Sequence, residues 1–225
     1  NENVEVTEVK PGEEYVLSQY PGLKDIVNEF QYEVLMEIAE EFPQDLKEKM
    51  DEIYNHEVPP EVRKNLIIDK IIFGYQKKKL LDRTKDILDD GHFVVFAVGD
   101  ADVPFAYTVG LTDICGKEVV FTMNGIDVET LYSITNSVGN LLKENPGLTE
   151  LPEDFLGNRT EEGNNLRTRI DFVPLRDAVT TRASLVDIFF DVEDHHQALY
   201  IRIADENNIL PGEEGFNEEF NQPEV

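Results

Sequence analysis

The hydrophobic positions of the first third of the chain predict helices. Apolar residues recur there at steps of three and four, which is typical of one buried helical stripe, at Leu23, Ile26, Val27, Phe30, Val34 and Ile38. Phe42-Pro43 ends this helix, because proline disfavours helical geometry in the residue before it. A second helix is predicted at about 45–55, and a third from near Glu61 to Asp90. Gly91 then matches a helix-ending glycine.

The pattern changes to strands at His92. Residues 92–98 form a β-branched and aromatic run, which predicts a strand buried on both faces. A turn follows at 99–102, and Pro104 introduces the next strand, 105–111. Two strands joined this closely predict a hairpin, which we place at the centre of the sheet.

Further strands and one long helix complete the prediction. Strands are expected at 118–123, 169–173 and 196–203, with a helix starting at Asp127 as its N-cap. Residues 183–190 fit either a helix or a strand. The expected fold is α+β, a helical module followed by a mainly antiparallel sheet, or partly open barrel, with one or two packed helices. The predicted divisions are an extended acidic arm, the helical module, the α+β domain and an acidic tail, at 1–20, 21–91, 92–216 and 217–225.

Charge restricts the partners of this chain. Among its 225 residues, acids outnumber bases 47 to 20, giving a net charge of −27. Such a charge repels phosphates and anionic membranes, so we expect no direct nucleic-acid binding and no membrane association. We expect a partner protein with a basic surface, and a cytoplasmic location. One cysteine, Cys115, excludes an internal disulfide and a multi-cysteine zinc site.

The segment from Val103 to Thr112, VPFAYTVGLT, resembles the signature of an uncharacterised bacterial and phage family of unknown function, DUF4262. A second match, 198–216, resembles that family's C-terminal motif, so the likeness covers about 82–216. It implies a strand, a short acidic turn and a second strand, as predicted at 92–111, but no activity. The family's distribution, together with the acidic charge, implies a bacterial or phage-infected cell as the setting of this cytoplasmic protein. Gly116-Lys117 replaces the family's His-Pro pair, and both tryptophans of the C-terminal motif are missing.

Several residues are candidates for chemistry. Asp100 and Asp102 flank the hairpin turn and could share a cation or a proton, although short acidic turns are common without either role. Tyr107 could donate to a ligand or be a core aromatic. Arginines in the acidic C-terminal half, including Arg169, could gather around an anion or form surface ion pairs. His195-His196 after Glu193-Asp194 offers zinc-ligand types, but adjacent strand residues face opposite sides. We expect no metal and no cofactor.

The first predicted helix carries a row of acids at about one turn's spacing: Glu29, Glu33, Glu37, Glu40 and Glu41. A solvated face is the usual interpretation of such a row. The sharper one is a surface that mimics phosphates and is presented to a nucleic-acid-binding protein. Three hypotheses therefore remain: a non-enzymatic protein-interaction protein, which we favour; a small-molecule-binding or hydrolytic domain with a pocket joining Asp102, Tyr107 and Arg169; and a DNA-mimic inhibitor.

Overall fold

The computed structural model describes residues 19–157 and 160–220. Their packing divides the chain into two compact units, the first ending at Arg83 and the second beginning at Thr84. The boundary lies inside a helix, α6 (Phe73–Asp89). The acidic arm predicted at 1–20 lies almost wholly outside the described residues, and so does most of the predicted tail.

The helical unit has its own hydrophobic core. Its elements are α2 (Leu23–Ile26), α3 (Glu29–Glu41), α4 (Pro43–Tyr54), α5 (Pro60–Ile67), the π-helical segment η1 (Ile68–Ile72) and the first part of α6. The core includes Leu35, Leu46, Met50 and Ile67, none more than 1% exposed. The third helix predicted from Glu61 to Asp90 is confirmed as the run α5, η1 and α6. Gly91 follows α6 with φ 77°, as expected for a helix-ending glycine.

The predicted first helix is wrong in one respect. Val27 is extended, so the helix is interrupted, and Asn28 starts α3 anew. The Asn28 side chain accepts from the Gln31 amide at 2.8 Å, and the Gln31 side chain accepts from the Asn28 amide at 3.0 Å. This restart rotates the buried face of α3 onto Val34, Leu35, Ile38 and Ala39. Phe30, predicted to face the core, is instead 62% exposed.

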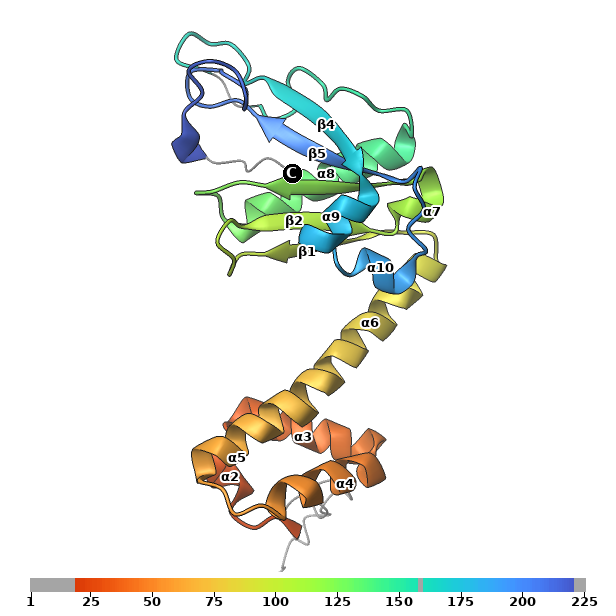
Figure 1. The fold of residues 1–225 in the computed structure, drawn as a ribbon, viewed down its shortest axis with the longest axis vertical. Coiled ribbons are helices and arrows are strands. Elements are labelled where there is room, and N and C mark those ends of the chain that lie inside the picture. Colours follow the sequence, from red (N-terminus) through yellow and green to blue (C-terminus); the bar gives the residue numbers. More distant parts are fainter. Residues whose placement is uncertain (1–18, 158–159, 221–225) are drawn as a thin grey trace, which may run out of the picture. The chain divides into compact units, whose positions relative to one another are not determined.

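The second unit contains one open sheet of five strands in the order β1-β2-β3-β5-β4 (Figure 1). The strands are β1 (Val94–Val98), β2 (Phe105–Val109), β3 (Lys117–Thr122), β4 (Thr168–Pro174) and β5 (Gln197–Ile203). All neighbouring pairs are antiparallel except β3 and β5. The fold is therefore α+β, as the sequence predicts.

The β1–β2 hairpin is confirmed, but its predicted position is wrong. β1 is an edge strand and only half-buried, whereas β3 occupies the centre of the sheet. The position of β3 comes from a parallel partner, β5, which is distant in sequence and which no local pattern indicates. β2 is an interior strand, with Ala106 to Val109 buried.

Helices cover both faces of the sheet (Figure 1). On one face α8 (Val128–Glu144) buries Leu131, Val138 and Leu142 against Ala106, Val119, Phe121 and their neighbours. On the other, α9 (Leu175–Thr181) and α10 (Val186–Phe189) pack against Tyr107, Val120 and Tyr200. The remaining elements are α7 (Leu111–Cys115) and the 3-10 turn η2 (Glu218–Phe220). The ambiguous stretch 183–190 therefore contains a short helix, and α9 was not predicted.

Candidate functional site

The structure does not bring Asp102, Tyr107 and Arg169 together. Tyr107 is 3% exposed and packs against Phe96 and Phe105, with ring centroids 5.7 and 6.2 Å away. Asp102 is exposed in the hairpin turn. Arg169 lies on β4, three strand positions from β2 and thus about 14 Å across the sheet. Burial raises the pKa of the Tyr107 hydroxyl, so Tyr107 has the surroundings of a core aromatic.

Arg169 belongs to a polar cluster on β4 and β5. Its Nε and Nη2 donate to Asp171 at 2.7 and 3.1 Å, and Nε of the buried Arg202 donates to Asp171 at 3.1 Å. The Arg169 guanidinium is the main cause that keeps the pKa of Asp171 below its usual range, and Arg202 contributes less. A concavity of about 470 Å³ borders Arg169, and it is lined by residues of two segments, 149–153 and 165–170, with Leu210. Because Arg167 is held by Glu213 at 2.8 Å, both arginines at this concavity already have carboxylate partners.

One ionisable group of the second unit, Glu118 on β3, is fully buried. Its Oε1 accepts from the backbone N–H groups of Gly110 (2.9 Å) and Thr112 (2.8 Å), and from the Thr112 hydroxyl (2.7 Å). Its Oε2 accepts from the Thr108 hydroxyl at 2.6 Å. Burial raises its pKa from 4.5 to about 7, although these donors act in the opposite direction.

The donors around the Glu118 carboxylate, hereafter the Glu118 cradle, account for three residues of the FAYTVGLT segment. Thr108, Gly110 and Thr112 all donate to Glu118, and the Thr108 hydroxyl also accepts from the Val119 amide at 2.8 Å. The backbone pairing of β2 and β3 ends at Tyr107 and Val120, so these side-chain hydrogen bonds continue the connection beyond it. Gly110 has φ +124°, and a Cβ there would lie 2.9 Å from the His92 carbonyl oxygen. Only glycine fits this position without strain.

Sequence reasoning missed this cradle. The sequence did contain a signal. Glu118 is a single acid before the apolar run Val119-Val120-Phe121, and Thr108 and Thr112 lie two residues before and two residues after Gly110. A buried carboxylate needs such donors. Since the carboxylate is fully buried and both of its oxygens are engaged by the protein's own donors, the cradle is a structural element that joins β2, α7 and β3.

The other candidate chemistries are not assembled into a site. Nδ1 of His196 accepts from the Glu193 amide at 3.0 Å, and His195 lies 3.2 Å from the Glu193 carboxylate. Burial raises the pKa of the Cys115 thiol. Within 19–157 and 160–220, no three His, Cys, Asp or Glu side chains are grouped to hold a metal ion. No helix in these ranges is long and apolar enough to cross a membrane.

The acids of α3 are all exposed. At 100° per residue, Glu29, Glu33, Glu37 and Glu40 lie within about 80° of one another around the helix and extend about 16 Å along it. None of these four, hereafter the acidic row, forms an ion pair with a residue that the structure describes. Glu41 differs, because it accepts from Lys79 and from the Tyr75 hydroxyl. The hydrogen bond from Lys79 is the main cause that lowers the pKa of Glu41, and the hydrogen bond from Tyr75 contributes less.

Comparison of the chain with family models, curated proteins and solved structures gives no match. The resemblance to DUF4262 therefore stays a prediction, and any function has to be argued from the geometry.

Proposed function

We propose that this chain is a non-enzymatic protein-interaction protein whose helical unit binds a basic surface of another protein through the acidic row. The supporting observation is the exposure of Glu29, Glu33, Glu37 and Glu40 on one side of α3, without ion pairs to described residues. Their mutual repulsion is not relieved within the described structure, and a cationic partner would relieve it.

An exposed aromatic side chain borders the acidic row. Phe30, 62% exposed, lies within about 20° of Glu37 around the helix axis. Binding energy in protein interfaces is concentrated in aromatic and arginine side chains, and charged groups chiefly set the association rate and the choice of partner. Phe30 supplies the apolar anchor in this proposal, and the acidic row supplies the attraction. The likeness to DUF4262 adds a bacterial or phage setting.

The experiment compares three tagged full-length proteins in a bacterial lysate. One is unchanged, one carries Gln at all four positions of the acidic row, and the control carries Gln at Glu144, Glu161, Glu162 and Glu214. These control residues are exposed in the second unit, so both variants lose the same charge. We expect the unchanged protein and the control to retain a common set of proteins at low salt, which the row variant loses. Equal retention by the row variant, or no retention by any of the three, would contradict the proposal.

The DNA-mimic hypothesis is a special case of the same binding mode. It requires the retained partner to be a nucleic-acid-binding protein, and excess duplex DNA to displace the chain from it. Displacement by DNA would identify the acidic row as a phosphate substitute. Retention of the complex in excess DNA would restrict the proposal to an ordinary protein interface.

A further inference from the structure

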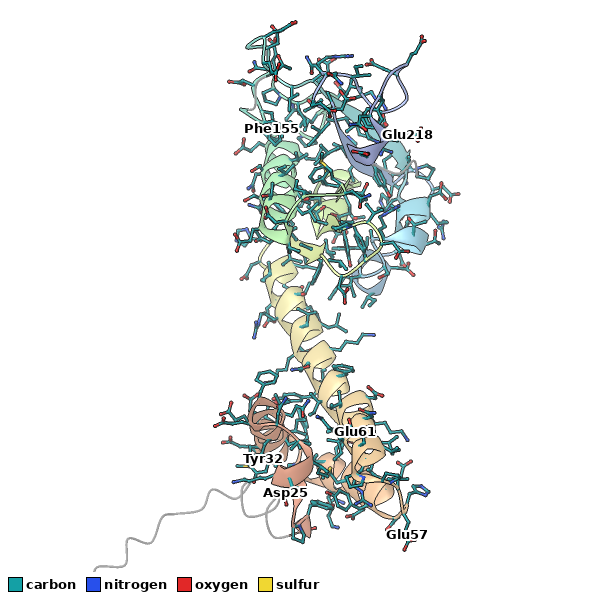
Figure 2. All side chains as sticks on the ribbon, turned by 90° about the vertical axis from the view of Figure 1, so that its left-hand side faces the viewer. Asp25, Tyr32, Glu57, Glu61, Phe155 and Glu218 are labelled. Carbon is teal, nitrogen blue, oxygen red and sulfur yellow. The ribbon has the colours of Figure 1, made fainter. Side chains whose placement is uncertain are left out.

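A concavity of about 370 Å³ lies next to the acidic row, where α2 meets α3. It is lined by Lys24, Val27, Asn28, Glu29, Tyr32 and Glu33. Figure 2 labels Tyr32 on this part of the helical unit. Two members of the acidic row, Glu29 and Glu33, therefore border a hollow that also contains an aromatic ring.

The aromatic ring already has a cation on its face. The Lys24 ammonium lies 4.7 Å from the centroid of the Tyr32 ring, which is the geometry of a cation–π interaction. Because Lys24 is exposed and lies on a short helix, a competing cation can displace its ammonium into solvent. The contact between Lys24 and Tyr32 therefore indicates that this ring can accept a cation.

The charges around the concavity also favour a cation. Glu29 and Glu33 contribute two carboxylates against the one ammonium of Lys24. The N-terminus of α3 would by itself favour an anion. However, the Asn28 and Gln31 side chains occupy two of its free amides, and Glu29 stands in its first turn.

We propose that this concavity receives an arginine side chain of the basic partner, stacked on Tyr32 in place of Lys24 and paired with Glu29 and Glu33. Arginine fits better than lysine, because its planar guanidinium can stack on a ring while donating to two carboxylates. The inference rests on the proposed function, which it extends by naming the partner group and its position on the row.

The probe is a fluorescent peptide of alternating arginine and alanine, titrated into the full-length protein at low salt. Matched peptides contain lysine, or citrulline, which keeps the shape of arginine without its charge. We expect the arginine peptide to bind most tightly and the citrulline peptide not to bind. Equal affinity for the arginine and lysine peptides would overturn the stacking proposed at Tyr32.

Three pairs of variants locate the binding. Lys24→Met should tighten the arginine peptide about threefold more than Lys77→Met, which removes the same charge from an exposed position on α6. Glu29→Gln with Glu33→Gln should weaken it more than Glu37→Gln with Glu40→Gln. Tyr32→Leu should weaken it about threefold while Tyr32→Phe keeps most of the affinity, with circular dichroism confirming that both are folded.

The outcomes separate the two proposals. The proposed function stands if the four-Gln row variant loses affinity for the arginine peptide. The concavity proposal nevertheless fails if Lys24→Met and Lys77→Met have the same affinity and the two pairs of glutamate substitutions weaken binding equally. If the row variant binds as well as the four-Gln control of the second unit, the proposed function fails too.

Discussion

Replacing Glu118 by Gln should reduce the pH dependence of the stability of the second unit. The pKa of Glu118 is about 7 in the folded protein and 4.5 when unperturbed. A raised folded-state pKa means that the folded protein keeps its proton as the pH rises from 4.5 to 7, while the unfolded chain loses it. The stabilising contribution is therefore complete below pH 4.5 and is lost as the pH rises through 7.

The magnitude follows from the gap between these two pKa values. At about 1.4 kcal/mol per pKa unit, it corresponds to about 3 kcal/mol of free energy of unfolding lost between pH 4.5 and pH 7. The side chain introduced by Glu118→Gln does not titrate, and its amide oxygen can still accept from Gly110 and Thr112. Its amide nitrogen can donate to the Thr108 hydroxyl, so we expect the variant to fold.

Hydrogen exchange of the Gly110 and Thr112 amides measures this effect locally, because both donate to Glu118. It also avoids assuming that both units unfold in one step. Subtracting the pH profile of the Gln variant removes the repulsion among the many other acids. The opening free energy of the unchanged protein minus that of the Gln variant should fall by about 3 kcal/mol from pH 4.5 to pH 7. Parallel profiles for the two proteins, or a carboxyl resonance of Glu118 that titrates near 4.5, would refute the reasoning.

Three further predictions concern the second unit. Gly110→Ala should lower the free energy of unfolding by about 3 kcal/mol in chemical denaturation, because a Cβ would meet the His92 carbonyl at a φ of +124°; Gly163→Ala, also at positive φ but with open space around it, is the control and should cost less. Asp205→Asn should speed hydrogen exchange of the Asn217 amide, since the buried Asp205 Oδ2 accepts from it at 2.7 Å and an amide group there would oppose it; unchanged exchange would refute this. Arg167 and the Leu210 amide lower the pKa of Glu213 to about 2, so the stability that the Arg167–Glu213 ion pair provides should be present above pH 4.5 and be lost as the pH falls through 2. Arg167→Gln should remove that loss in acid unfolding, and identical acid-unfolding profiles of the two proteins would count against it.

Local patterns predicted most elements of this fold, because the periodicity of apolar residues reflects burial on one side of an element. The hairpin, the helix capped by Asp127 and the α5–α6 run all follow from such patterns. One failure arises where distant segments decide, and the other comes from a local helix-start signal, Asn28 with Gln31, that the apolar stripe obscured. The parallel pairing of β3 with β5 moved the hairpin to the side of the sheet, and the Asn28 capping box rotated α3 so that Phe30 became exposed.

The candidate sites show the same division. Exposure of the five acids follows from the position of the apolar residues on α3, and sequence alone indicated it. The Glu118 cradle was missed because its donors lie on a different strand and its turn, and their approach depends on the β2–β3 register. The concavity between α2 and α3 was missed because the apolar stripe continues through Val27, which concealed the new helix start marked by Asn28 and Gln31.

The most direct test of the proposed function is a carbodiimide cross-link between the full-length chain and a partner retained from the lysate. This reagent joins carboxylates to lysines that touch them, so peptide mass spectrometry identifies the surface in contact. We expect the cross-links to involve Glu29, Glu33, Glu37 or Glu40. Cross-links confined to carboxylates of the second unit, with the acidic row unmodified, would contradict the account.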